Sequence, residues 1–327
     1  MKKTVKIISM ILALSMLLFA FASCSDKKEK QGTQDENYTL KVGTIKGPTG
    51  MGMAKIINDN LTDEDYTFEL FNDATAISAK LLGQQLDIAA VPVNLAAVVN
   101  KKTEGAYVVA AINTLGVLYI MENGTTVNSV SDLEGKTIHA YGQGATPEYM
   151  LAYILEKNGL KDKVTVQWYS TPAELATLAA EGKRDLIMLP EPQITSSLTK
   201  NADLRVALDI TAEWDKISEN KAVQGCIVVK KEIAEKYPEK VSQFLDEYKA
   251  SVKYVNENPA EASVMIAANE IIPAAPVAAL AIPRCNIVFI EGDEMISYLN
   301  AFYTVLFNAN PQSVGGTMPN ESLYYKR

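Results

Sequence analysis

Two loops rich in glycine and threonine contain the residues best suited to hold a small polar molecule. One spans Lys46–Met51 and the other Gly142–Thr146, and each lies between a run that predicts a strand and a stretch that predicts a helix. Glycine lets the backbone approach a ligand closely, threonine offers a hydroxyl, and free amides point outward at the start of a helix. Each loop alone could also be an ordinary capped turn, and neither matches the phosphate-binding loop or the dinucleotide fingerprint.

The second loop opens a helix whose start is well specified by its residue types. Thr146 stands where an N-cap belongs, Pro147 suits the first helical position, and Glu148 lies in the first turn. In this arrangement we expect the amides of Gly144–Thr146 to be free to grip a polar or anionic group.

Two further strand ends, Val91–Asn94 and Leu189–Pro192, belong with these loops. Glu191 stands between two prolines in an apolar stretch, so its charge needs a partner unless it lies at a solvated rim. In open α/β sheets, ligands bind beyond the carboxyl ends of the strands. We therefore expect the two loops and the two strand ends to face one another across a cleft between two lobes.

The residue types offer little material for catalysis. His139 is the only histidine and stands inside a strand predicted to be buried, so a structural role is expected for it. Cys226 and Cys285 lie on apolar segments without a basic neighbour, which suits free buried thiols or a disulfide between them. No spaced pair of carboxylates stands out. The sequence predicts that the chain is not an enzyme and has no catalytic residue, no metal site and no cofactor.

The elements that position these residues alternate along the chain. From Tyr38 to about Lys230, short β-prone runs alternate with helical stretches, and this alternation predicts an α/β fold with covered sheets. After Lys230 the pattern is mostly helical and is interrupted by prolines, so we expect a layer of helices packed on a sheet already formed.

The chain crosses between its two expected lobes at two places. One lies within Leu118–Gly135, where an apolar strand runs into a polar turn and a capped short helix, and the other is the apolar run Gln224–Val229. These crossings predict a discontinuous lobe one at residues 38–123 plus 225–327, and a lobe two at residues 124–224.

The amino-terminal end has the order of a secretory signal peptide. Lys2, Lys3 and Lys6 precede a short apolar run, which ends in small residues and Cys24. This end resembles a bacterial lipobox, which implies removal of residues 1–23 and a lipid on Cys24. Residues 24–37 contain no large apolar side chain, so they predict a flexible tether. We expect an extracytoplasmic protein held at the cell membrane.

Charge also restricts the expected partners. The net charge is −8 and no basic cluster is visible, which argues against nucleic acid as a partner. No later segment is long and apolar enough to predict a membrane span.

Several separated motifs resemble those of a known family: GTIKGPTGMGMA, DIAAVPVNLAA, SDLEGKTI, GQGATPEYML, LPEPQIT, GCIVVKKEIAEKYPEKVSQFLDEYKASVKYVNENP and SVGGTMPNESLYYK. Together they are similar to the substrate-binding proteins of ABC importers, in the nitrate, taurine and alkanesulfonate or the thiamine-pyrimidine-precursor branch. The resemblance covers residues 38–327. It implies the type II periplasmic-binding-protein fold, with two α/β lobes joined by two crossing strands.

The resemblance also implies a function and a site. The chain would be a monomer that captures a small polar or anionic ligand and delivers it to an ABC permease driven by ATPase subunits. The residues expected to bind the ligand are Lys46, Gly47, Pro48, Thr49, Gly50, Met51, Pro92, Asn94, Gly142, Gln143, Gly144, Ala145, Thr146 and Glu191.

The nature of the ligand stays open. No arginine falls on a matched loop and Lys46 is the nearest cation, whereas Tyr141, Trp168 and Trp214 could stack on a planar ring or belong to the core. Sulfonate, nitrate and pyrimidine-like ligands all remain candidates. The alternative function is an enzyme of the same fold, of the pyrimidine-precursor-synthase or chorismate-dehydratase type, and a scaffold or adhesin is a further rival.

Overall fold

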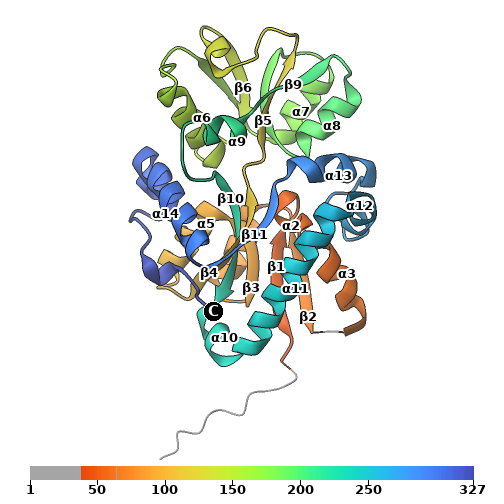
Figure 1. Cartoon of the computed structure of the whole chain (residues 1–327), viewed down its shortest axis with the longest axis vertical. Coiled ribbons are helices and arrows are strands. Elements are labelled where there is room, and N and C mark those ends of the chain that lie inside the picture. The colour runs from red at the N-terminus through yellow and green to blue at the C-terminus, as the bar shows by residue number, and fades with distance from the viewer. Residues whose placement is uncertain (1–37, 64) are drawn as a thin grey trace, which may run out of the picture. The chain divides into compact units, whose positions relative to one another are not determined.

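The computed structural model describes residues 38–63 and 65–327, and Thr39–Arg327 forms one compact unit with strands in two sheets (Figure 1). The expected signal peptide, the lipidated Cys24 and the tether lie outside the described residues. Within the described part of the chain, no helix combines the length and apolar character that a bilayer crossing requires.

The larger sheet has six strands in the order β11-β4-β10-β3-β1-β2. Strand β1 is parallel to β2 and β3, whereas β10 is antiparallel to its neighbours β3 and β4. We call this sheet and the helices packed on it the large lobe. Its strands are β1 (Leu40–Ile45), β2 (Tyr66–Phe71), β3 (Ile88–Pro92), β4 (Tyr107–Leu115), β10 (Val223–Lys230) and β11 (Ile287–Ile290).

The smaller sheet has five strands in the order β7-β6-β8-β5-β9, and we call it with its helices the small lobe. Strand β6 is parallel to β7 and β8, and β5 is antiparallel to β8 and β9 in the paired segments. Its strands are β5 (Leu118–Asn123), β6 (Thr137–Tyr141), β7 (Thr165–Tyr169), β8 (Leu186–Pro190) and β9 (Leu204–Asp209).

The two sheets share one plan. Leaving out one strand in each sheet, β1 to β4 of the large lobe lie in the order β2-β1-β3-β4, and β6 to β9 of the small lobe lie in the matching order β7-β6-β8-β9. The strand left out lies between the third and fourth of these strands and is antiparallel to both. It is the first strand that the chain forms after it crosses from the other lobe. That strand is β10 in the large lobe and β5 in the small lobe. The predicted two-lobed α/β fold with two crossings is confirmed.

The first crossing is short. Strand β4 ends at Leu115 and β5 begins at Leu118, so only Gly116 and Val117 connect the sheets. The predicted boundary placed residues 118–123 in lobe one, whereas β5 pairs within the small lobe. A strand that leaves one sheet and a strand that enters the next have the same apolar pattern, so the pattern could not separate them. The rest of the predicted division stays a prediction.

Helices cover both sheets, and the last third of the chain is mostly helical as predicted. The α-helices are α2 (Pro48–Met51), α3 (Ala54–Asp63), α4 (Ala74–Leu82), α5 (Val93–Lys102), α6 (Thr146–Lys157), α7 (Pro172–Ala180), α8 (Gln193–Lys200), α9 (Ile210–Asp215), α10 (Lys231–Lys236), α11 (Pro238–Glu257), α12 (Pro259–Ala268), α13 (Ala275–Ala281) and α14 (Gly292–Ala309). The described residues also form four 3-10 turns: η1 (Val130–Leu133), η2 (Ile282–Arg284), η3 (Pro311–Val314) and η4 (Glu321–Leu323).

One side of the seam between the lobes is a packed apolar core. Trp214 of α9 is 1% exposed and packs against Tyr153 of α6 and Phe302 of α14. Its indole nitrogen donates to the carbonyl of Asn220 at 2.6 Å. Trp214 is therefore a core residue that joins small-lobe helices to α14, and it is not available to stack on a ligand.

The disulfide considered for Cys226 and Cys285 is not formed, because both thiols are free and buried. Strand β4 lies between β10, which carries Cys226, and β11, which follows Cys285. Strands two places apart are separated by about 10 Å, whereas the Cα atoms of a disulfide lie within about 7 Å.

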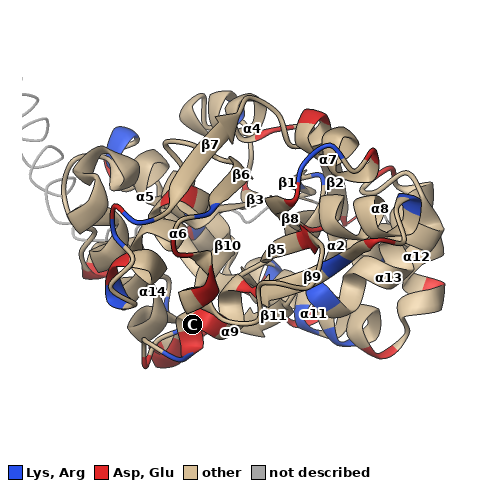
Figure 2. Ribbon diagram, turned by 90° about the horizontal axis from the view of Figure 1, so that it is seen from above, with Lys and Arg blue, Asp and Glu red and all other residues tan. Residues whose placement is uncertain are grey.

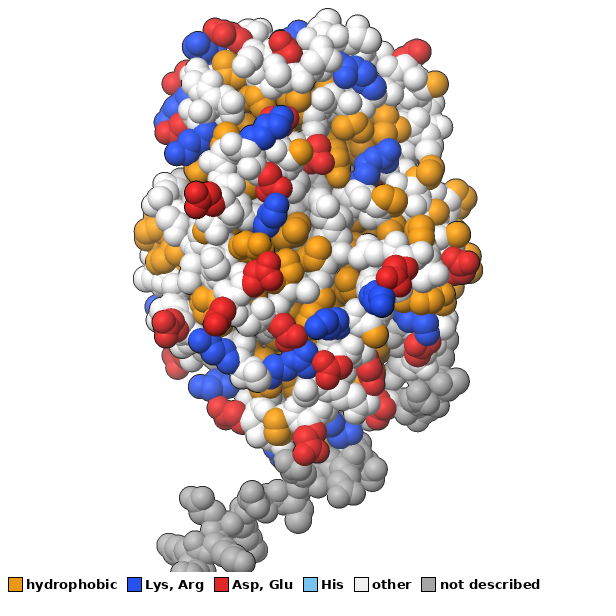
Figure 3. Space-filling view, in the orientation of Figure 1, with side chains coloured by type: hydrophobic (Ala, Val, Ile, Leu, Met, Phe, Trp, Pro, Cys, Tyr) orange, Lys and Arg blue, Asp and Glu red, His pale blue; other side chains and the backbone are white. Residues whose placement is uncertain are grey.

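Charged residues of both signs are interspersed over the ribbon and on the face shown in space-filling form (Figures 2 and 3). That face has no single-sign basic patch of the kind that binds a phosphate backbone.

Candidate ligand-binding site

A cavity of about 390 Å³ lies between the two lobes, beside both crossings. The large lobe contributes Lys46–Thr49 and Ile271–Pro273 to its wall, and the small lobe contributes Pro190–Gln193. Val117 of the first crossing, Gln224 of the second, and Asn72 after β2 complete the lining. Parts of the chain that are far apart in sequence thus share one concave surface.

The first predicted loop forms part of this wall because its backbone turns sharply. Gly47 has φ 104°, a conformation that side-chain-bearing residues rarely adopt, and its amide donates to the carbonyl of Ile271 at 3.2 Å. A Cβ at Gly50 would lie 2.6 Å from the carbonyl oxygen of Ile45. Asn113 Nδ2, on β4, donates to the carbonyl of Thr49 at 3.0 Å, and this bond holds the loop against the sheet. Lys46, Gly47, Pro48 and Thr49 line the cavity, whereas Gly50 and Met51 are buried behind it.

The second predicted loop does not line the cavity. The amide of Gly144 donates to Oε2 of Glu148 at 2.5 Å, and the amide of Ala145 donates to the carbonyl of Gly142 at 3.1 Å. Two of the three amides expected to be free for an anion are therefore occupied by the chain itself. Thr146 is 3% exposed and is the first residue of α6, so the N-cap is Ala145 rather than Thr146.

Two other predicted positions also lie away from the cavity wall. Pro92 is the last residue of β3 and Asn94 lies in the first turn of α5, and neither is part of the cavity lining. The exposed Gln143 likewise lies outside it. A strand end predicts which edge of a sheet a residue occupies, but it does not predict which of the neighbouring loops reaches the cavity.

Glu191 lies in the cavity wall, but its carboxylate faces protein. The side chain is 0% exposed. Its Oε1 accepts from the hydroxyl of Thr195 at 2.9 Å and lies 3.5 Å from Nη1 of Arg284, and its Oε2 accepts from the amide of Thr195 at 3.2 Å. The sequence indicated that this charge needs a partner, and the partner stands in a distant segment of the chain.

Burial raises the pKa of Glu191 above its ordinary value, although the bonds from Thr195 and the charge of Arg284 act in the opposite direction. The direction is the one expected when desolvation outweighs partial pairing. Arg284 retains 38% exposure and so neutralises the buried carboxylate only in part.

Several residues of the cavity wall were not predicted from the sequence. Gln224 was assigned only to a crossing strand, yet its Oε1 is buried and has no hydrogen-bond partner among the described residues. Asn72 follows β2, so the strand-end rule could have found it. Nothing in the helical pattern before α13 pointed to Ile271–Pro273.

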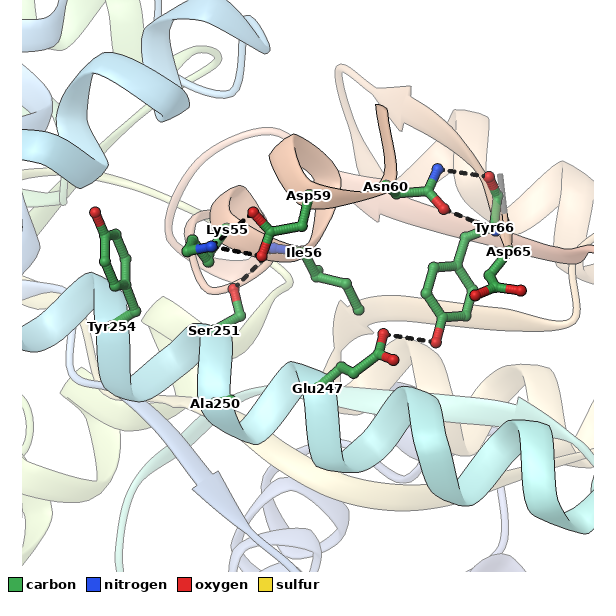
Figure 4. A pocket seen from close by; sticks show the side chains of 10 residues that line it. All are labelled: Lys55, Ile56, Asp59, Asn60, Asp65, Tyr66, Glu247, Ala250, Ser251 and Tyr254. Atoms are coloured by element: carbon green, nitrogen blue, oxygen red, sulfur yellow. Dashed lines mark hydrogen bonds and ion pairs between the residues drawn. The ribbon is translucent and has the colours of Figure 1, made fainter. Parts of the chain in front are cut away.

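A second hollow of about 460 Å³ lies between α3 and α11, on the large lobe alone (Figure 4). Lys55 Nζ bonds both carboxylate oxygens of Asp59, at 2.6 Å and 2.5 Å, and the hydroxyl of Tyr66 donates to Glu247 at 2.7 Å. Its charged groups largely satisfy one another. The cavity between the lobes is the stronger candidate, because both lobes and both crossings build it.

Groups with catalytic potential are few in the described chain. His139 Nδ1 lies 3.1 Å from the hydroxyl of Tyr169, within a hollow of the small lobe away from the cavity. Burial raises the pKa of the Cys226 and Cys285 thiols, which keeps them protonated and poorly nucleophilic. Among residues 38–63 and 65–327, no group of three or more His, Cys, Asp or Glu side chains is arranged to hold a metal ion.

Comparisons with known proteins point in two directions. A family model described as menaquinone biosynthesis matches residues 50–303. A search of curated proteins finds no match.

Solved structures share the fold. An ABC transporter from Parabacteroides distasonis is 21% identical over 88% of this chain and 99% of its own, with a TM-score of 0.76. The periplasmic aliphatic sulphonate binding protein SsuA from Escherichia coli is 15% identical over 88% and 94%, with a TM-score of 0.68. The periplasmic nitrate-binding protein NrtA from Synechocystis PCC 6803 is 13% identical over 85% and 84%, with a TM-score of 0.59.

Proposed function

The chain belongs to the menaquinone biosynthesis family, and from that premise we propose that it binds a small organic molecule in the cavity between its two lobes. The observation that carries this proposal is the cavity itself, whose wall takes residues from both lobes and both crossings. Its volume of about 390 Å³ is in the range of small-molecule sites, about 300–1,000 Å³. Seven apolar or proline residues in the wall suit a ligand with an apolar part: Pro48, Val117, Pro190, Pro192, Ile271, Ile272 and Pro273.

The prediction that the chain is not an enzyme is wrong, because the matching family model is one of menaquinone biosynthesis and points to an enzyme. That prediction rested on the scarcity of histidine and of reactive thiols. Catalysis can rest on carboxylates, amides and backbone groups that hold a substrate in a reactive geometry, and such groups leave no conspicuous sequence motif.

Two functions for the cavity follow, and each has its own support. In the first, the chain is an extracytoplasmic solute-binding protein that delivers its ligand to an ABC permease. The names of the structures with the same fold support this function, as does the basic, apolar and cysteine-containing start of the sequence. In the second, the chain converts its ligand chemically, and membership of the family supports this function.

The localisation and partners belong to the first function. We propose that a lipid on Cys24 holds the chain at the outer face of the cell membrane, where it meets the permease as a monomer. The small residues before Cys24 and the polar stretch after it support this arrangement.

Mass spectrometry of the purified protein lacking residues 1–24 tests the proposal. We expect one small organic molecule to be released on denaturation. When it is returned to the stripped protein, an unchanged mass supports delivery and a new product supports catalysis. Absence of any released molecule, together with no thermal shift across a metabolite library, would contradict the proposed cavity ligand.

Two threonine variants test where that molecule binds. Thr49→Ala should weaken binding by about 0.5–1.5 kcal/mol if its hydroxyl bonds the ligand, since that is the net worth of a typical hydrogen bond. The matched Thr146→Ala variant should leave affinity unchanged, because Thr146 is buried outside the cavity. Isothermal calorimetry distinguishes them, and the opposite pattern would move the site to the second loop.

A further inference from the structure

The two sides of the seam between the lobes are held by different chemistry. On one side, in the apolar core, Trp214 of the small lobe packs on Phe302 of α14 and on Tyr153 of its own lobe. On the other side, beside the cavity, α8 of the small lobe meets α13 of the large lobe (Figure 1), and Arg284, which follows α13, makes polar contacts with Glu191 and Thr195 of the small lobe. An apolar core resists separation, whereas exposed polar contacts can break and reform in water.

Arg284 is the centre of the polar side. It ends the 3-10 turn η2, which follows α13 in the large lobe. Its Nη1 donates to the hydroxyl of Thr195 at 3.0 Å and lies 3.5 Å from Oε1 of Glu191, both in the small lobe. Its carbonyl accepts from the hydroxyl of Tyr119 on β5 at 2.9 Å. One residue of the large lobe is thus tied to three residues of the small lobe.

The carboxylate of Glu191 can be read in two ways. It accepts from the amide and hydroxyl of Thr195, so it also serves the start of α8 within its own lobe. That local role would be fulfilled without Arg284. The guanidinium adds a charge from the other lobe to a carboxylate that is otherwise completely buried, and this part of the arrangement can exist only while the lobes are together.

We propose that Glu191, Thr195 and Arg284 form a latch that holds the lobes together beside the cavity, with Arg284 as a positioning residue that controls closure. This inference rests on the proposed function, since a latch matters only if the cavity between the lobes takes a ligand. Arg284 is not part of the cavity lining, so it acts through the position of the small lobe and not through contact with the ligand. Its 38% exposure leaves the ion pair only partly desolvated, so the latch can open reversibly.

Distances between spin labels on the two lobes test the latch in ligand-free protein. Labels on Lys161→Cys and Glu235→Cys, in protein lacking residues 1–24, occupy exposed positions of the small and large lobe, respectively, and the thiols of Cys226 and Cys285 are buried. We expect the distance distribution to broaden and its mean to lengthen in Arg284→Met. Glu191→Gln keeps the shape of the side chain and one oxygen that can accept from Thr195, removes the charge, and should shift the distribution in the same direction.

Arg205→Met is the matched control. Arg205 Nη2 lies 2.6 Å from Oε2 of Glu122, a pair of the same chemistry that lies wholly within the small lobe. The latch predicts an unchanged distribution for this control. Unchanged distributions in both latch variants, or an equal shift in the control, would overturn the latch.

Failure of the latch and failure of the proposed function are separate results. The label distances are measured without any ligand, so they report on closure even if no molecule binds the cavity. If Arg284→Met does not fold, as a thermal melt would show, Glu191→Gln decides the matter alone.

Discussion

His139 lies in a strand, as the sequence predicted, but the scarcity of histidine misled the prediction about catalysis. It is the only histidine of the chain and stands in β6, half-buried, with Nδ1 3.1 Å from the hydroxyl of Tyr169. Arg184 Nε donates to the same hydroxyl at 2.8 Å. The residue thus belongs to a small polar cluster on the small lobe, and its rarity says nothing about catalysis in the cavity.

Because no other histidine is present, His139 gives a clean test of stability against pH. Burial, and then the charge of Arg184, lower the pKa of His139. The unfolded chain binds a proton at about pH 6.5, whereas the folded chain binds it only at lower pH, so stability is lost as the pH falls. We expect the free energy of unfolding of wild type, relative to His139→Gln, to decrease between about pH 7.5 and about pH 5.5.

Urea unfolding at several pH values measures this difference. Carboxylates titrate alike in both proteins and cancel, so the difference isolates the imidazole. A difference that is constant, or that grows as the pH falls, would contradict a lowered pKa of the half-buried His139.

Glu191 shows what can and cannot be predicted at the scale of a residue. Its position between two prolines in an apolar stretch predicted a charge in need of a partner, and the structure supplies one. The partner could not be identified from the sequence, because Arg284 lies in the last third of the chain and carries no motif. Only the folded arrangement of α8 and α13 brings the two together.

Among the elements, the first crossing is notable for Gly116, which has the least room for a side chain of the described glycines. A Cβ at Gly116 would lie 2.1 Å from Oγ1 of Thr211 in α9, and the carbonyl of Gly116 accepts from Asn286 Nδ2 at 2.6 Å. The hydroxyl of Thr211 is itself buried and has no partner among the described residues. Space, rather than hydrogen bonding, therefore requires glycine at this point.

Gly116→Ala should lower the free energy of unfolding by about 1–3 kcal/mol, the usual cost of overpacking. Denaturant unfolding measures the loss. The double variant Gly116→Ala/Thr211→Ala should recover part of it, because the nearest atom is removed. Equal stabilities of the single and double variants would show that α9 does not press on the crossing.

The sequence predicted the elements better than it predicted the cavity. Alternating apolar and helical patterns gave the α/β class and the helical last third, because burial of each strand and helix is recorded in its own residues. Of the two predicted loops, Lys46–Thr49 reaches the cavity and Gly142–Thr146 does not. Both have the same local chemistry. What separates them is their place in the folded chain, since only the first loop lies beside Ile271 and the strand end at Pro190–Gln193, and sequence alone could not show this.

For the molecule as a whole, fold and family carry different information. The two-lobed fold is shared with proteins described as binding aliphatic sulphonate and nitrate, and the family is described by menaquinone biosynthesis. A cavity between hinged lobes can serve capture or conversion, since both require a ligand to be enclosed. The cellular compartment of the chain therefore helps to decide between capture and conversion of the ligand.

Attachment of lipid to Cys24 is the test of compartment. We expect the full chain to incorporate labelled palmitate and to enter the detergent phase of a phase-separation assay, because the residues around Cys24 resemble a lipobox. Cys24→Ser should abolish both. Cys226→Ser is the matched control, since its thiol is buried and should not affect labelling. Label that persists in Cys24→Ser would contradict the anchor.

The position of β10 bears on how the nascent chain acquires its structure. It stands between β3 and β4, although 107 residues separate Leu115 at the end of β4 from Val223 at its own start. Until Val223–Lys230 has been synthesised, β3 and β4 each keep an open edge, whereas all five strands of the inserted lobe end by Asp209. The small lobe can therefore complete the hydrogen bonds of its sheet before the large lobe does. A chain truncated ahead of Val223 would leave β4 unpaired from the strands β2, β1 and β3 of the large lobe.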